Sequence, residues 1–269
     1  MNKKMVMIIV VAAVVLGAII FLSSKRINNP VKSSGHLSAR SLSAQARALE
    51  SKGNLWEAKL LYQKLVNDFS ESKEVMDWQK KTEELNIKLL FSGVVTPKSI
   101  VYQIRPGDTL NKIAREHKTT TELIKRSNNI NDALIIPGRK IKVWNVPFNI
   151  LVDKSQNILL LKDNEEVVKS YIVSTGKNNC TPVGTFKIVN KLPNPTWFKA
   201  GAVVPPESDQ NVLGTRWMGF DLAGYGIHGT TEPKELGKQV TQGCVRLGNA
   251  DVEELYSIVP VGTEVMVIE

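Results

Sequence analysis

The spacing of apolar residues changes along this 269-residue chain, and the change predicts several domains. Between residues 37 and 92, apolar or small residues recur at helical spacing, for example at Leu42, Ala46 and Leu49. From Phe148 onward, short apolar runs alternate with turn residues, which is the pattern of strands. The sequence therefore predicts a multidomain protein with a helical N-terminal part and a mainly-β C-terminal part.

Residues 1–24 are predicted to form a transmembrane anchor. Residues 5–22 are uncharged and mostly aliphatic, and 18 such residues are near the minimum for a membrane span. Basic residues flank both ends of the run, so the positive-inside rule does not set its orientation. No clear small-x-small cleavage site follows, which favours an uncleaved anchor over a cleaved signal peptide. Residues 25–36 are polar and predict a linker.

Residues 37–92 are predicted to form a helical spacer. Gly53 and Asn54 interrupt the helical pattern and predict a hairpin, and a third helical stretch follows from about Glu74 to Leu90. Residues 53–69 are similar to one tetratricopeptide-type repeat, which must pack on a neighbour, a partner or another copy. The simpler interpretation is a spacer that holds the C-terminal part of the chain away from the membrane.

The net charge of +9 is unevenly distributed. Lys and Arg minus Asp and Glu give 14 − 8 = +6 for residues 1–97 and 10 − 4 = +6 for residues 98–145. Residues 146–269 give 11 − 14 = −3. The positive charge thus lies near the predicted membrane segment and in a small central module. A polyanionic surface such as cell wall or lipid headgroups fits this gradient, and no nucleic-acid partner is expected.

Residues 100–145 form a separate unit with the predicted order strand, helix, helix, strand (βααβ). Asp108 or Thr109 can cap the first helix, and Gly138 permits the turn before the last strand. The unit resembles a LysM module over essentially its whole length, in the patterns YxIxPGDTLxxIA, LIxxSNNI and IxPGxxIxV. The resemblance implies binding of N-acetylglucosamine-containing glycans, which means peptidoglycan in bacteria. A βααβ domain that has lost ligand binding is the alternative.

One cysteine and one histidine stand out in the C-terminal part. His228 lies in Gly-Ile-His-Gly-Thr, and Cys244 follows sixteen residues later in Gly-Cys-Val-Arg-Leu. The small Gly243 before the cysteine and the charged Arg246 after it predict a thiol of lowered pKa. No second His or Cys lies at ligand spacing, so we expect no metal and no cofactor.

Cys180 is the only other cysteine in the sequence, and two cysteines are too few for a disulfide framework. It has no His or Arg close by in sequence, unlike Cys244. An incidental free thiol is therefore expected, with a regulatory disulfide to Cys244 as the alternative.

Residues 147–269 resemble the catalytic domain of L,D-transpeptidases of the YkuD type. The matching motifs are Ile-His-Gly-Thr at residues 227–230, Gly-Lys at 237–238 and Gly-Cys-Val-Arg-Leu at 243–247, with supporting matches at 173–176, 181–186, 249–252 and 259–263. Gln242 departs from many members, at a position that varies within the family. The cysteine–histidine order excludes papain-type wall peptidases, and the short spacing disfavours sortases.

The resemblance implies a role for each matching residue. Cys244 would attack the carbonyl of the third residue of a tetrapeptide stem and expel the terminal D-alanine. His228 would accept the thiol proton, and the carbonyl of Gly229 would orient its imidazole. Backbone N–H groups around Gly243 and Cys244 would hold the oxyanion.

Three further residues receive weaker expectations. Arg246 would steady the cysteine loop or a substrate carboxylate, although a structural salt bridge is an equal alternative. Tyr225 and Thr230 are expected to bind substrate.

The sequence thus predicts a peptidoglycan L,D-transpeptidase of the bacterial cell envelope, which serves cell-wall biogenesis and cell shape. The catalytic domain would lie outside the cytoplasm, in the periplasm or cell wall, on a single-pass anchor. The acceptor, whether a second stem peptide, a protein or water, stays open, as do the third stem residue, the oligomeric state and the Gram type. A carboxypeptidase that trims stems and a catalytically inactive LysM-type wall-binding scaffold are the alternatives.

Overall fold

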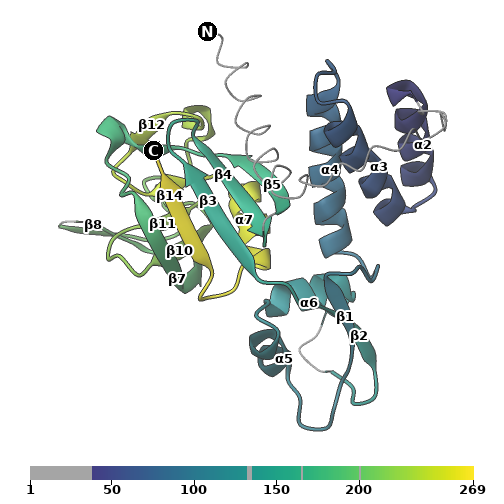
Figure 1. Ribbon diagram of the computed structural model, residues 1–269. Helices are drawn as coiled ribbons and strands as arrows, with labels where there is room; N and C mark the ends of the chain where they lie inside the picture. Colours follow the sequence, from purple (N-terminus) through teal and green to yellow (C-terminus); the bar gives the residue numbers. More distant parts are fainter. Residues whose placement is uncertain (1–37, 132–134, 165, 200) are drawn as a thin grey trace. The chain divides into compact units, whose positions relative to one another are not determined.

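The computed structural model describes residues 38–131, 135–164, 166–199 and 201–269 (Figure 1). The chain divides into two compact units, Met1–Asn86 and Ile87–Glu269, which we describe separately. The predicted anchor and linker, residues 1–24 and 25–36, lie outside the described residues. Within the described ranges, no helix has both the length and the apolar character needed to cross a bilayer.

The first unit is helical, as predicted. Helix α2 (Ala39–Ser51) and helix α3 (Leu55–Asp68) form the expected hairpin, and α4 (Val75–Leu90) follows, with its last four residues in the second unit. Gly53 occupies the turn with φ +79°, a conformation that glycine adopts without steric cost. The buried hydrophobic residues of the unit form one cluster, which consists of Leu42, Ala46, Ala58, Tyr62, Leu65, Trp78 and Leu85.

The second unit begins with the βααβ arrangement predicted for the LysM region. Strand β1 (Ser99–Gln103) pairs antiparallel with β2 (Lys140–Trp144), and helices α5 (Leu110–Glu116) and α6 (Thr121–Ser127) lie between them in the chain. Thr109 caps α5, because its side chain accepts the N–H of Lys112 at 3.2 Å. Asp108 instead accepts the N–H of Arg105 at 2.8 Å, which tightens the preceding turn.

The C-terminal part contains an eight-stranded mixed sheet in the order β13-β11-β10-β7-β14-β3-β4-β5 (Figure 1). Strand β14 pairs parallel with β3 and antiparallel with β7, so the C-terminal strand lies inside the sheet. The strands are β3 (Phe148–Asp153), β4 (Ile158–Asp163), β5 (Glu166–Ile172), β7 (Gly184–Pro193), β10 (Arg216–Phe220), β11 (Gly226–His228), β13 (Val245–Arg246) and β14 (Glu264–Ile268). Helix α7 (Asn249–Ile258) contributes three buried residues to the core.

Smaller elements complete this part of the chain. Two short ladders pair β6 (Thr175–Gly176) with β12 (Gln239–Thr241) and β8 (Trp197–Lys199) with β9 (Ala202–Val204). Two 3₁₀ turns are η1 (Lys177–Asn179) and η2 (Pro233–Glu235). The mainly-β expectation is confirmed.

The LysM region and the sheet share one hydrophobic core, which the sequence did not predict. Leu123 of α6 and Trp144 of β2 belong to the same buried cluster as residues of the sheet and of α7. Trp144 stacks on Phe148, with ring centroids 5.4 Å apart and an interplanar angle of 8°. Lys98 forms ion pairs with Asp163 and Glu166 across the same junction. The LysM region is therefore packed against the sheet.

This shared core predicts that the sheet loses stability when the LysM region is removed. A chain shortened to residues 147–269 should unfold with a free energy at least about 2 kcal/mol lower than a chain of residues 87–269, because it exposes apolar side chains such as Phe148. Urea unfolding of both chains measures the difference. Equal midpoints and equal slopes would mean that the two parts are energetically independent.

Candidate active site

Two neighbouring strands and the turn before one of them bring Cys244, His228 and Arg246 to the same cavity. His228 is the last residue of β11, and its parallel partner across the ladder is Arg246 of β13. Cys244 lies in the turn just before β13 (Val245–Arg246), two residues ahead of Arg246. The parallel pairing thus gathers residues that are sixteen or more positions apart in the sequence.

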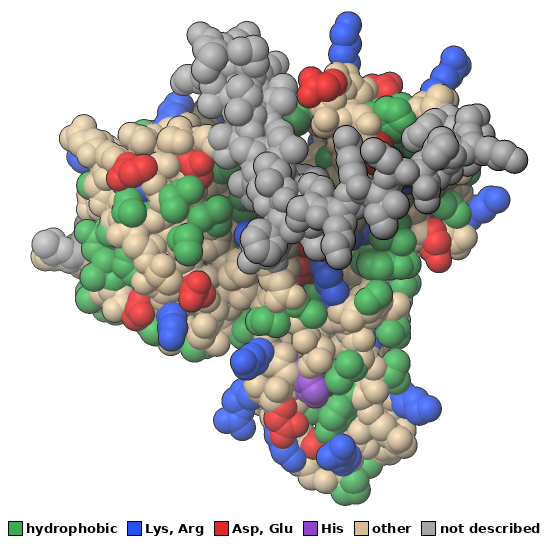
Figure 2. All heavy atoms as spheres, in the orientation of Figure 1, with side chains coloured by type: hydrophobic (Ala, Val, Ile, Leu, Met, Phe, Trp, Pro, Cys, Tyr) green, Lys and Arg blue, Asp and Glu red, His purple; other side chains and the backbone are tan. Residues whose placement is uncertain are grey.

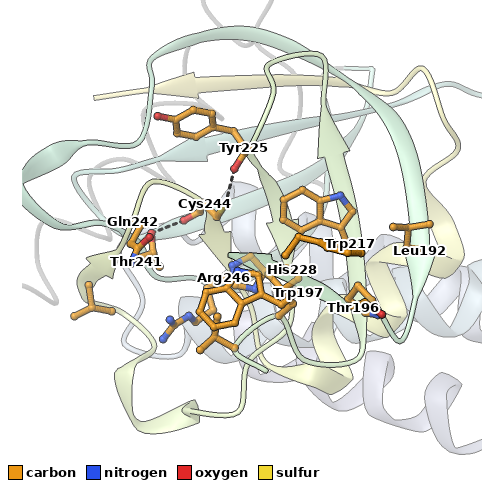
Figure 3. A pocket seen from close by; sticks show the side chains of 16 residues that line it. Leu192, Thr196, Trp197, Trp217, Tyr225, His228, Thr241, Gln242, Cys244 and Arg246 are labelled. Atoms are coloured by element: carbon orange, nitrogen blue, oxygen red, sulfur yellow. Dashed lines mark hydrogen bonds between the residues drawn. The ribbon is translucent and has the colours of Figure 1, made fainter. Parts of the chain in front are cut away.

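The three side chains line one cavity of about 580 Å³ (Figure 3). Its walls are largely aromatic and apolar, with contributions from β7, β8, β10 and the turns before β11 and β13. The lining residues are Leu192, Pro195, Thr196, Trp197, Phe198, Val212, Leu213, Trp217, Gly224, Tyr225, His228, Val240, Thr241, Gln242, Cys244 and Arg246.

A tight turn holds Cys244 at the edge of this cavity. The hydroxyl of Thr241 donates to the carbonyl of Cys244 at 2.7 Å and accepts the N–H of Gly243 at 3.1 Å. The Cys244 thiol donates to the carbonyl of Gly224 at 3.5 Å. Because the N–H of Gly243 is engaged inside the turn, it is a poorer oxyanion donor than the sequence suggested.

Gly243 has no tolerance for a side chain. Its φ of +125° is in the region that favours glycine, and a Cβ built there would lie 2.6 Å from Cε1 of Tyr225. The residue before Cys244 is therefore fixed as glycine by its backbone conformation and by the closeness of the Tyr225 ring.

We expect Gly243→Ala to lower the free energy of unfolding by about 1–3 kcal/mol and to slow acyl transfer at least tenfold. The turn must move to relieve the contact with Tyr225, and Cys244 moves with it. Gly262→Ala is the matched control, because Gly262 also has a positive φ (+92°) but no atom lies within 4 Å of its built Cβ. Urea unfolding and a D-alanine release assay measure both effects. Equal rates for the two variants would contradict this account.

His228 is buried, with 3% of its surface exposed. Its Nδ1 lies 2.7 Å from the carbonyl oxygen of Gly229, which can only accept, so Nδ1 carries the proton and Nε2 is left as the basic atom. The Gly229 carbonyl thus lies within hydrogen-bond distance of the imidazole, and its orienting role stays a prediction. Burial lowers the pKa of His228 to about 4, and the charge of Arg246 adds to this effect against the opposing carbonyls of Gly229 and Leu213. The imidazole is therefore neutral near pH 7.

Arg246 is held by two acidic side chains. Its Nη1 lies 3.0 Å from Oε2 of Glu232 and 2.9 Å from Oε2 of Glu235, and its side chain is 8% exposed. Glu235 belongs to η2, so the ion pairs tie this 3₁₀ turn to the strand that follows the cysteine. The structural salt bridge that the sequence left as an alternative is thus formed.

The predicted lowering of the thiol pKa is wrong. Burial raises the pKa of Cys244 to about 11, and the hydrogen bond at Gly226 and the charge of Arg246 only partly offset this. The physical reason is that Arg246 is paired with Glu232 and Glu235, while the thiol is largely removed from water. The resting site therefore holds a neutral thiol beside a neutral imidazole.

Of the remaining residues predicted for the site, Tyr225 lines the cavity and Thr230 does not. Tyr225 lines the cavity, as expected for a substrate-binding residue. Thr230 is absent from the cavity lining and is buried; its hydroxyl accepts the N–H of Glu232 at 2.8 Å. Cys180 is exposed, and both Cys180 and Cys244 are free thiols.

Asn249 holds the loops around His228. An asparagine at a helix start often caps the helix, but α7 begins at Asn249 itself, with Gly248 as its N-cap and no side-chain cap. The Asn249 side chain instead accepts the N–H of Thr230 at 3.0 Å and the N–H of Thr215 at 3.3 Å. A single sequence cannot distinguish these uses, because an amide at a helix start suits both.

Comparison with known proteins places the chain in a family. Residues 147–267 match the model of the L,D-transpeptidase catalytic domain (YkuD), and residues 102–144 match that of the LysM domain. YkuD of Bacillus licheniformis is 35% identical over 177 residues, which cover 62% of this chain and 98% of that protein. YkuD of Bacillus subtilis is 34% identical over 175 residues, with the same two coverages.

A solved structure, the catalytic domain of the Enterococcus faecium L,D-transpeptidase, is 25% identical and covers 45% of this chain and 96% of its own, with a TM-score of 0.38. On the strength of the sequence matches, the chain belongs to the YkuD family of L,D-transpeptidases. It carries a LysM domain N-terminal to the catalytic domain. Both family predictions are confirmed.

Proposed function

We propose that this protein is a peptidoglycan L,D-transpeptidase with Cys244 as nucleophile and His228 as base. The observation that carries the proposal is that His228, at the end of β11, and Cys244, in the turn before the adjacent β13, line one cavity in a chain of this family. The donor would be a tetrapeptide stem, and the bond between its third residue and the terminal D-alanine would be broken.

The protonation states of the free site define the order of events. A neutral thiol and a neutral imidazole do not form a stable ion pair beforehand, so proton transfer accompanies attack. As Sγ of Cys244 bonds to the stem carbonyl carbon, Nε2 of His228 takes the thiol proton. The carbonyl oxygen becomes an oxyanion, for which the N–H of Cys244 is the nearest backbone donor along the chain, since Gly243 is engaged by Thr241.

The second half returns the enzyme to its starting state. The imidazolium of His228 gives its proton to the amine of D-alanine as the C–N bond breaks and a thioester forms on Cys244. An acceptor amine then attacks the thioester while His228 takes a proton from it. An amide forms, and the thiol regains its proton.

The LysM domain would hold the catalytic site close to an insoluble substrate, the cell wall. A LysM domain that binds glycan strands would raise the local concentration of stem peptides around the cavity. Because it shares a core with the catalytic domain, it would do so at a fixed distance. Such an enzyme acts outside the cytoplasm, where the wall is.

The function is tested by incubating purified disaccharide-tetrapeptide with the protein and analysing the products by mass spectrometry. Release of D-alanine together with a crosslinked dimer is the expected result. Release without a dimer would indicate trimming or a protein acceptor. If a folded, reduced enzyme gives no reaction, the wall-binding scaffold becomes the better explanation.

A further inference from the structure

Trp217 lies against the imidazole of His228. The two residues are direct partners on the antiparallel strands β10 and β11. Their ring centroids are 6.1 Å apart, with an interplanar angle of 23°. Figure 3 shows the indole beside His228 on the wall of the cavity. This contact needs an explanation because Trp217 is only half-buried, whereas His228 is almost fully covered.

A side-chain acceptor holds the indole in this place. Nε1 of Trp217 donates to Oδ1 of Asn190 on β7 at 3.0 Å. The same oxygen accepts the N–H of Gly219 at 3.2 Å, next to the register shift between β10 and β7. Asn190 therefore fixes both the indole and the backbone beside it.

Two glycines leave room for the indole. A Cβ at Gly226 would lie 3.0 Å from Cζ2 and Cη2 of Trp217, and a Cβ at Gly219 would lie 2.8 Å from its Nε1. Neither glycine has a positive φ, so the need for glycine here is one of space. Three strands thus contribute to a slot that fits this one side chain.

We infer that Trp217, held by Asn190, is a positioning residue that fixes the imidazole of His228 and shields it from water. The inference rests on the proposed role of His228 as the base. The other groups that face the imidazole are Arg246, the Cys244 thiol and the carbonyls of Gly229 and Leu213. The carbonyl of Gly229 holds Nδ1 of the imidazole, and the indole of Trp217 covers the part of the imidazole that faces β10.

The shielding has a measurable consequence. Burial is the largest cause of the low pKa of His228, so removing the indole admits water and should raise that pKa toward its ordinary value of 6.5. A base with a raised pKa is protonated in weakly acidic solution. The variant should then lose activity below pH 6.5 more than above it.

The test is an NMR titration of the His228 ring in the full-length protein, with the signal assigned by its loss in His228→Gln. In Trp217→Leu we expect the midpoint to rise by at least one pH unit. Trp217→Phe keeps an aromatic ring over the imidazole and should shift the midpoint less than half as far. D-alanine release at pH 4.5 relative to pH 8 should be at least about threefold lower in Trp217→Leu than in the wild type, because a pKa of 5 or more leaves most of the imidazole protonated at pH 4.5.

An unchanged midpoint in a folded Trp217→Leu variant would overturn the inference, and so would a rise in KM alone, which would make Trp217 a substrate wall. If Trp217→Leu does not fold, the same titration is made on Asn190→Leu. This variant removes the hydrogen bond that holds the indole but keeps the indole itself. If the His228 midpoint rises in Asn190→Leu, the inference is supported. If the midpoint stays unchanged in that variant, the inference is overturned. If the wild-type protein releases no D-alanine, the proposed function fails, but the titration still decides the role of Trp217.

Discussion

Cys244→Ala is expected to lower D-alanine release from a tetrapeptide donor by at least about 10⁴-fold, because loss of a catalytic nucleophile costs about this much or more. The cavity lining offers no equal replacement: the Thr241 hydroxyl already donates to the carbonyl of Cys244. The same variant should show no mass increase after incubation with a carbapenem, whereas the wild-type chain should gain one β-lactam.

Cys180→Ala is the matched control for this experiment. Cys180 is the second free thiol of the chain, but it is exposed and absent from the cavity lining. Its removal should leave D-alanine release and carbapenem acylation within about twofold of wild type. The assignment of the nucleophile would be wrong if Cys180→Ala lost acylation while Cys244→Ala kept it.

His228→Gln is expected to slow acylation by about 10²–10⁴-fold at pH 7, the usual contribution of a positioned general base. The pH dependence distinguishes this loss from a structural one. Since the pKa of His228 is about 4 and that of Cys244 about 11, the wild-type rate should be nearly constant between about pH 5 and 9. Without the base only the thiolate can attack, so the variant's rate should rise about tenfold per pH unit until pH approaches 11.

Stopped-flow acylation by a carbapenem over this pH range measures both profiles. Thr230→Ser is a matched control from the same segment, since a serine hydroxyl can still accept the N–H of Glu232. A wild-type acid limb near pH 6.5, or a His228→Gln rate that does not depend on pH, would contradict the assigned protonation states.

Much of the local geometry of the candidate site could be predicted from sequence because its motifs are local. The segment around His228 contains the carbonyl that orients the imidazole, and the segment around Cys244 contains the glycine that its turn requires. Both depend on backbone within two residues of the reacting group. Local pattern is sufficient for such features.

The electrostatics could not be predicted in the same way. Arg246 is two residues from Cys244, and sequence closeness suggested a stabilised thiolate. In the fold its guanidinium turns to Glu232 and Glu235, while the half-buried thiol loses part of its solvation. Burial and ion pairing are set by tertiary contacts, and these reversed the direction of the pKa shift.

Long-range packing could not be predicted from the pattern of apolar residues in the sequence either. Leu123 and Trp144 fit the apolar pattern of a separate LysM module, yet they belong to the core shared with the catalytic domain. Trp217 carried no motif of its own, and its relation to His228 depends on strand pairing and on glycines in two strands. One sequence without aligned relatives gives no signal for such contacts.

The central claim is that Cys244 becomes acylated by the stem peptide, and trapping this thioester tests it most directly. The protein is mixed with a disaccharide-tetrapeptide donor without acceptor, quenched in acid within seconds and examined by intact and peptide-level mass spectrometry. We predict a mass increase equal to the donor minus D-alanine, located on Cys244. D-alanine release at the wild-type rate from Cys244→Ala, or an adduct on another residue, would contradict the account.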